Sequence, residues 1–154
     1  ALVYDAVAAV DLECRALAGT EPAADTDEAR RVRSAAREQG VPVIASVHDF
    51  DATPPVAELS ELLRAAAEEG DVAKLAVTAT DRGDALDLLT ATHRATAAGE
   101  TVATMGMGEA GRHTRAVAPA YGSKIGYAPV DPADATAPGQ YALATLRRLV
   151  DELG

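Results

Sequence analysis

Residues 41–54 read VPVIASVHDFDATP, and this stretch decides which fold the sequence predicts. From Val41 to Val47 the residues are apolar or small, as in a strand of a parallel sheet that is buried on both faces. The chain then presents His48 directly before a turn that contains proline. A buried strand that ends on an imidazole places a group that titrates near neutral pH at one edge of the sheet.

Apolar segments of the same kind recur along the chain, with helical segments between them. We expect five strands, the last one the weakest, at residues 6–13, 41–47, 72–78, 101–107 and 123–130. The clearest helix candidates lie at residues 25–40, 54–70, 81–99 and 138–153. This alternation of strand and helix predicts an α/β fold with a parallel sheet.

Two α/β architectures fit this alternation: an open doubly wound sheet and a closed (β/α)8 TIM barrel. The length of 154 residues favours the open sheet, because a barrel typically needs about 250 residues. The polar residues favour the barrel, because successive strands contribute them toward one centre. Asp11 and Glu13 finish the first expected strand, His48 finishes the second, and Lys74 lies within the third.

Composition and charge disfavour several classes of protein. The 24 acidic and 14 basic residues give a net charge of −10, which disfavours binding to nucleic acid because phosphate contacts need a clustered basic surface. No apolar run approaches the roughly 20 residues of a membrane span, so we expect a cytoplasmic protein without membrane contact. The single Cys14 is expected to be a small buried hydrophobe, and the histidines lack metal-ligand spacing, so neither metal nor cofactor is expected.

Lys74 occupies an unusual position for a lysine. In the expected strand it shares a face with Val72 and Ala76, so its neighbours are small or apolar. Burial favours the free amine, which is a nucleophile toward a carbonyl group. The alternative is a structural ion pair with Asp11 or Glu13, and the residues alone leave both interpretations open.

Four segments together resemble a known family. They read VPVIASVHDF (41–50), DVAKLAVT (71–78), TMGMGEAGRHTRAVAPAYGSKIGYA (104–128) and ATAPGQ (135–140). In this order and spacing they resemble type I 3-dehydroquinate dehydratase, the Schiff-base enzyme of the shikimate pathway, whose fold is a (β/α)8 barrel. The resemblance covers the last five βα units of that barrel. It therefore implies that residues 1–154 form a single domain, the C-terminal part of a barrel whose first three units are missing.

The resemblance also implies a reaction and a set of site residues. The reaction is the dehydration of 3-dehydroquinate to 3-dehydroshikimate, in which Lys74 forms the Schiff base and His48 is the general acid and base. Arg115 would bind the substrate carboxylate, while Thr136 and Gln140 would hydrogen-bond the substrate and close the site. The expected partner is this small molecule; neither a cofactor nor a metal is required, and a homodimer is left open.

Further roles and other functions stay open from the sequence. Asp11 and Glu13 are candidates for orienting His48 or tuning Lys74, and the alternative is ion pairing in the core without catalysis. Phe50 is expected to fill space beneath the turn after His48. Two other functions fit the residues: another Schiff-base enzyme of the class I aldolase barrel type, and a non-catalytic open-sheet α/β binding domain.

Overall fold

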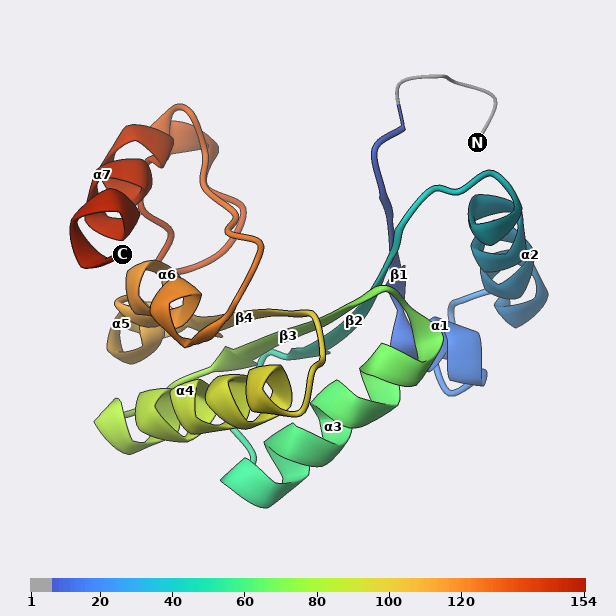
Figure 1. The fold of residues 1–154 in the computed structure, drawn as a ribbon, viewed down its shortest axis with the longest axis horizontal. Helices are drawn as coiled ribbons and strands as arrows, with labels where there is room; N and C mark the ends of the chain where they lie inside the picture. The colour runs from blue at the N-terminus through green and yellow to red at the C-terminus, as the bar shows by residue number, and fades with distance from the viewer. Residues whose placement is uncertain (1–6) are drawn as a thin grey trace.

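The structure, a computed structural model, describes residues 7–154 and is built on a parallel sheet of four strands (Figure 1). The strands are β1 (Val10–Glu13), β2 (Val43–Asp49), β3 (Val72–Thr78) and β4 (Val102–Met107). They pair in the order β1-β2-β3-β4, so every strand lies beside its neighbour in sequence. A barrel has this order, whereas a doubly wound sheet reverses direction at a switch point. The barrel-type α/β fold expected from the sequence is confirmed.

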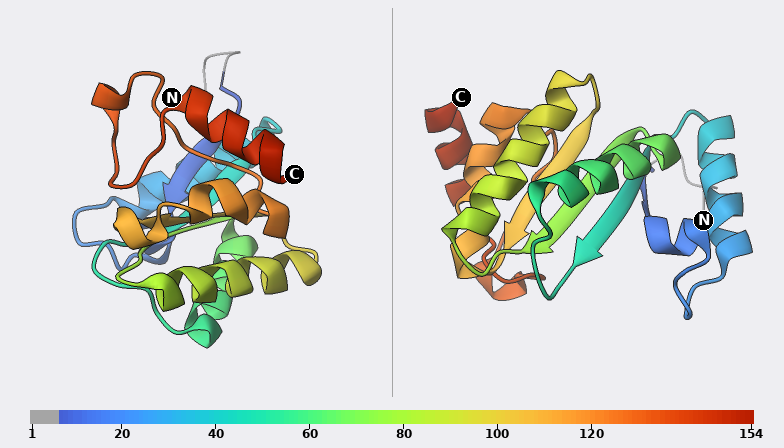
Figure 2. Two further views of the ribbon diagram at one scale, coloured as in Figure 1. Left: turned by 90° about the vertical axis from the view of Figure 1, so that its left-hand side faces the viewer. Right: turned by 90° about the horizontal axis from the view of Figure 1, so that it is seen from below.

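Helices cover mainly one face of the sheet. The helices are α1 (Cys14–Ala18), α2 (Thr26–Glu38), α3 (Val56–Glu69), α4 (Arg82–Ala97), α5 (Gly108–Gly111), α6 (Thr114–Val117) and α7 (Leu143–Leu153), with 3-10 turns η1 (Ala118–Tyr121) and η2 (Pro132–Asp134). Two of them, α3 and α4, lie against one face of the sheet, while α7 lies on the other side of it (Figure 2). Helices packed on the outer face of the strands are again typical of a barrel.

Local signals in the sequence explain where the helices begin. A capping box opens α4, because the Asp81 side chain accepts a hydrogen bond from the Asp84 backbone N–H at 3.0 Å. The Asp84 carboxylate in turn accepts one from the Asp81 N–H at 3.4 Å. Pro55 precedes α3, where the missing N–H of proline leaves no helical hydrogen bond unmade.

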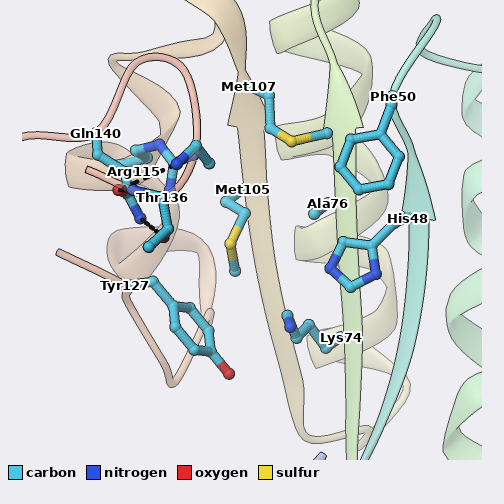
Figure 3. Close-up of a pocket in the computed structure, with 11 residues that line it drawn as sticks. His48, Phe50, Lys74, Ala76, Met105, Met107, Arg115, Tyr127, Thr136 and Gln140 are labelled. Carbon is cyan, nitrogen blue, oxygen red and sulfur yellow. Dashed lines mark hydrogen bonds between the residues drawn. The ribbon is translucent and has the colours of Figure 1, made fainter. Parts of the chain in front are cut away.

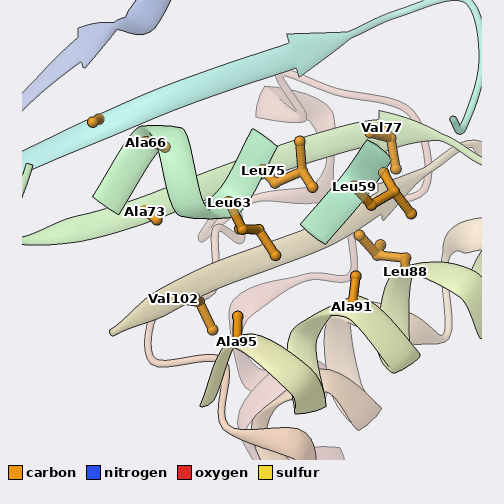
Figure 4. Packing of buried hydrophobic residues seen from close by; sticks show 11 residues of the cluster. Leu59, Leu63, Ala66, Ala73, Leu75, Val77, Leu88, Ala91, Ala95 and Val102 are labelled. Carbon is orange, nitrogen blue, oxygen red and sulfur yellow. The ribbon is translucent and has the colours of Figure 1, made fainter. Parts of the chain in front are cut away.

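The two faces of the sheet differ in chemistry because side chains alternate along each strand. Leu75 and Val77 of β3 are fully buried and pack with leucines of α3 and α4 into the main core (Figure 4). On the opposite face Lys74 pairs in register with Ser46 of β2, and Ala76 pairs with Met105 of β4. The period-two alternation thus separates an apolar core from a face that carries polar groups.

The expected fifth strand at residues 123–130 is wrong, as is the expected start of the first strand. One backbone hydrogen bond joins the segment to β4, from the Lys124 N–H to the Val102 carbonyl oxygen at 2.8 Å, and no strand forms there. Pro129 has no N–H to donate to a ladder, and Gly126 disfavours an extended strand by its entropy. β1 begins at Val10; Ala6, the expected first residue of that strand, lies outside the described residues.

The last helix is shorter than expected. It begins at Leu143 instead of near Pro138, and Pro138 belongs to a loop that precedes the helix. Gly139 in this loop has φ +79°, which favours glycine, and a Cβ there would lie 2.6 Å from the Gly108 carbonyl oxygen. The loop is therefore packed closely against the turn after β4. On α7, Leu146 is buried while Leu143 is exposed.

Candidate active site

A pocket of about 220 Å³ lies on the face of the sheet that α3 and α4 leave open (Figure 3). The five residues assigned to the site by resemblance all line it. They come from separate elements and are Lys74 of β3, His48 of β2, Arg115 of α6, and Thr136 and Gln140 of the loop before α7. Ala76, Met105 and Met107 supply much of the apolar lining. The parallel register of β2, β3 and β4 positions the strand residues on this common face.

Lys74 is buried and ion-paired. The residue is 8% exposed, and its Nζ donates to Asp11 Oδ2 at 2.7 Å. The second oxygen of Asp11 accepts a hydrogen bond from the Ser46 hydroxyl. Of the two acidic residues considered as partners of Lys74, the structure pairs Asp11 with it. The lysine nevertheless lines the pocket, so the ion pair leaves its amine within reach of a ligand.

His48 is held by the other acidic residue of β1. Its Nδ1 forms a hydrogen bond with Glu13 Oε1. Since a carboxylate can only accept, the hydrogen lies on Nδ1 and the neutral ring keeps a lone pair on Nε2. A histidine in this tautomer can accept a proton from a ligand in the pocket.

Of the two residues after His48, Asp49 is hydrogen-bonded within the turn and Phe50 is exposed. Asp49 fixes the turn, because its Oδ1 accepts hydrogen bonds from the backbone N–H groups of Asp51 and Ala52, both at 2.9 Å. Phe50 does not fill space beneath the turn, contrary to expectation. It is 71% exposed, and its ring stacks on the His48 ring with centroids 5.6 Å apart and planes inclined by 4°.

Arg115 is a buried cation whose hydrogen-bonding capacity is largely unused. The residue is 5% exposed, one Nη donates to the Pro138 carbonyl oxygen at 3.4 Å, and Nε is buried without a partner. Burial lowers the pKa of Arg115 below its usual value. Within residues 7–154 no carboxylate forms an ion pair with this guanidinium. A planar cation in this state suits an anionic ligand, and a carboxylate matches its geometry.

Thr136 and Gln140 close one side of the pocket and are bonded to each other. Gln140 Oε1 accepts from the backbone N–H groups of Thr136 and Ala137 at 2.8 and 3.3 Å. Gln140 Nε2 donates to the Thr136 hydroxyl at 3.4 Å. These bonds hold both polar groups at the rim, beside Arg115 (Figure 3).

Tyr127 is a pocket residue that sequence reasoning missed. It lies in the segment expected to be the fifth strand, where alternation gave no indication of its direction. In the structure it packs against the cluster that the lining residues Ala76, Met105 and Met107 form. The one signal that could have drawn attention to Tyr127 is that residues 104–128, which carry the family resemblance, include it.

Residues 7–154 contain neither a metal-binding cluster nor a membrane-spanning helix. No group of three or more His, Cys, Asp or Glu residues in this range could hold a metal ion. In the same range no helix has the length and apolarity needed to cross a bilayer. Gly106 of β4 and Gly111 of α5 serve packing, since a Cβ on Gly106 would lie 2.9 Å from the Gly111 Cα.

Comparisons with known proteins agree on one family. The family model described as type I 3-dehydroquinase matches residues 1–154. The 3-dehydroquinate dehydratases of Haloarcula marismortui and Halobacterium salinarum are 59% and 54% identical over 153 and 149 residues, or 99% and 97% of this chain. The chain spans less than two thirds of the length of these relatives, 65% and 64% respectively.

Solved structures show the same relationship. 3-Dehydroquinate dehydratase from Geobacillus kaustophilus matches with a TM-score of 0.79 at 33% identity, covering 94% of this chain and 52% of that one. The type I enzyme from Clostridium difficile, with covalently modified comenic acid, matches with a TM-score of 0.78 at 29% identity, covering 95% of this chain and 55% of that one.

Proposed function

The chain belongs to the type I 3-dehydroquinase family, and from this premise we propose that it converts 3-dehydroquinate to 3-dehydroshikimate and water through a Schiff base. The observation that carries the proposal is the pocket that joins a buried lysine, a histidine bonded through Nδ1 to Glu13, and a buried arginine that pairs with no carboxylate of residues 7–154. Such a set can bind an anionic ketone, capture it covalently and move a proton.

Arg115 binds the carboxylate of the substrate. Its buried Nε–H has no hydrogen-bond partner among residues 7–154 and is free to donate to a ligand. A guanidinium binds a carboxylate through two parallel hydrogen bonds. Thr136 and Gln140 exchange their mutual hydrogen bonds for bonds to the substrate hydroxyls. The substrate is then anchored at the rim with its ketone directed toward β3.

Lys74 forms the covalent bond. Asp11 lies 2.7 Å from Nζ and is the group placed to accept the proton that the ammonium must lose. The free amine adds to the C3 ketone carbon, and a C=N bond replaces C=O. The ketone oxygen leaves as water with one proton from the nitrogen and the proton that Asp11 had accepted. The protonated imine that results carries a positive charge and makes the neighbouring C2 proton acidic.

His48 moves the proton. Its Nε2 takes the proton from C2 and then gives it to the C1 hydroxyl, which leaves as water while the C1=C2 double bond forms. The bond from Nδ1 to Glu13 holds the ring and stabilises the imidazolium between these two transfers. Hydrolysis of the imine consumes one water, regenerates the ketone and restores Lys74, so the overall reaction releases one water.

The same proposal includes the rest of the barrel. The four described strands are part of an eight-stranded barrel that is completed by βα units which precede them in relatives of full length. Support comes from the sequential strand order and from solved relatives of which this chain covers about half. The cytoplasmic location and the homodimer remain predictions from the sequence.

The two alternative functions are less well supported. A class I aldolase-type enzyme would share Lys74, but the family match extends over residues 1–154 and favours the dehydratase. An open-sheet binding domain would have a switch in strand order, which the described sheet lacks.

The function is tested by following the ultraviolet absorbance of the conjugated product with the natural protein and two lysine variants. Lys74→Ala should lose nearly all turnover, on the order of a thousandfold or more, because the covalent route is gone. Lys124→Ala is the matched control, since Lys124 is the other lysine of the sequence and is exposed. No turnover by the wild-type protein, or equal losses in both variants, would contradict the proposal.

A further inference from the structure

The ring of Tyr127 lies over the amine of Lys74. The Nζ atom is 4.7 Å from the ring centroid, within the range in which an aromatic face attracts a cation. Tyr127 packs against the apolar cluster of Ala76, Met105 and Met107, and this packing holds it beside the lysine. Figure 3 shows Tyr127 approaching the pocket from the segment after η1, on the side opposite β2.

The hydroxyl of Tyr127 meets the counter-ion of the same lysine. It donates to Asp11 Oδ2 at 3.5 Å, and this oxygen also accepts from Lys74 Nζ at 2.7 Å. Burial raises the pKa of Tyr127 above its usual value, which keeps the hydroxyl protonated and able to donate. One tyrosine therefore contacts both members of the ion pair, with its ring on the cation and its hydroxyl on the anion.

Resting on the dehydratase function proposed above, we propose that Tyr127 is a positioning residue that stabilises the positive charge of the protonated imine on Lys74 more than that of the resting ammonium. The imine nitrogen occupies the place of the ammonium nitrogen and carries the same sign of charge. The ammonium has three N–H groups and donates one of them to Asp11, whereas the imine keeps one N–H and spreads its charge over the C=N bond. The imine therefore depends more on the negative face of the ring.

The geometry separates two contributions. The ring acts on the charge of the nitrogen, while the hydroxyl limits where the Asp11 carboxylate lies. The hydroxyl contact is long at 3.5 Å and therefore weak, whereas the cation lies well within range of the ring. We accordingly expect the ring to account for most of the effect.

The test compares Tyr127→Phe, which keeps the ring, with Tyr127→Leu, which removes it, in the natural protein. The fraction of Lys74 reduced by borohydride at subsaturating 3-dehydroquinate measures how much imine is present. Tyr127→Leu should lower the equilibrium constant for imine formation by about 5- to 30-fold, the range of a cation–π contact. Tyr127→Phe should stay within about threefold of the wild-type protein.

Two controls separate this role from a general effect on folding. Tyr121→Leu removes an exposed tyrosine outside the pocket and should leave imine formation unchanged. Melting temperatures of all variants show whether Tyr127→Leu is folded. Rescue by phenylalanine is the decisive comparison, because Tyr127→Phe restores the aromatic face without restoring the hydroxyl.

Each outcome decides the inference. Loss in Tyr127→Leu with rescue in Tyr127→Phe supports it. Equal losses in both variants would assign the effect to the hydroxyl and overturn the role of the ring. If the wild-type protein forms the adduct and a folded Tyr127→Leu variant forms as much, the inference alone is wrong. If Tyr127→Leu does not fold, the Tyr127→Phe variant decides. Imine formation far below that of the wild type then overturns the inference, and imine formation equal to that of the wild type supports it. If the wild type forms no adduct, the proposed function and the inference both fail.

Discussion

Asp11→Asn removes the charge that faces Lys74 but keeps an oxygen that can accept from Ser46, so it isolates the contribution of the ion pair. The two charged atoms lie 2.7 Å apart, with the Lys74 side chain 10% exposed and the Asp11 side chain 37% exposed. Breaking a fully buried pair costs about 3–5 kcal/mol, while an exposed pair contributes about 0–1 kcal/mol. Because one partner is buried and the other is partly hydrated, we expect a loss of about 2 kcal/mol in the free energy of unfolding.

The matched control is Glu68→Gln. Glu68 pairs with Arg64 at 2.9 Å, nearly the same distance, but these side chains are 69% and 62% exposed. Removing that charge should change the free energy of unfolding by less than about 0.5 kcal/mol. The two variants therefore differ mainly in how far water screens the pair.

Urea unfolding of the natural protein, its single variants and the double variant with Lys74→Met measures the coupling. Once Lys74 is apolar, Asp11→Asn should cost less than about 0.5 kcal/mol, because no buried cation is left without its partner. The reasoning is refuted if Asp11→Asn costs no more than Glu68→Gln, or if it costs the same with and without Lys74.

Three further predictions concern single residues and the whole surface. His48→Ala should still form the reducible adduct on Lys74 but should lower turnover by about 10²- to 10⁴-fold, and turnover near that of the wild type would contradict the role of the imidazole. Cys14 is half-buried, and burial followed by the nearby charges of Glu13 and Asp11 raises the pKa of its thiol to about 11 from 9.0. Since the thiolate reacts, alkylation of the folded protein by iodoacetamide at pH 8 should be roughly 100-fold slower than in urea; equal rates would show that the thiol is not shielded. The net charge of −10 predicts that the melting temperature rises with KCl concentration. The length over which salt screens the repulsion between acidic side chains falls from about 30 Å at 0.01 M to about 3 Å at 1 M. A melting temperature that falls over this range would show that self-repulsion is not important.

The strands could be predicted where the sequence pattern has a single interpretation. The segment 72–78 forms β3 with the same bounds, because its apolar run is closed by Gly70 before it and by a capped helix after it. The segment 123–130 has a similar apolar character, but Pro129 cannot donate a ladder hydrogen bond and Gly126 weakens a strand through its entropy. The start of α7 was misplaced for a related reason: Pro138 suits a first helical turn, yet the left-handed Gly139 next to it ends that possibility.

The site could be predicted in part. Strand alternation places Lys74 and His48 on the pocket face, because pairing in the sheet fixes the direction of each side chain. Alternation does not predict which acidic residue pairs with Lys74. In the sheet register Ser46 lies opposite both Glu13 and Lys74, so Glu13 is the acidic residue at the level of the lysine. The flexible lysine side chain nevertheless bonds to Asp11. Tyr127 lies in irregular backbone, where no period indicates a direction.

The residues beyond β4 depended on the family resemblance. Arg115 lies on a helix of four residues, too short for a hydrophobic period to orient it. Thr136 and Gln140 lie on a loop whose position is set by the contact of Gly139 with Gly108, which is remote in sequence. Long-range contacts of this kind are not encoded in any local pattern.

The most direct test of the Schiff-base mechanism is the mass of the peptide that contains Lys74 after the natural protein is incubated with 3-dehydroquinate and reduced with borohydride. The mechanism predicts that the reduced imine is found on Lys74, with Lys124 unmodified, and that the adduct is absent without borohydride. Rapid turnover of 3-dehydroquinate by a protein whose Lys74 peptide stays unmodified after reduction would contradict it.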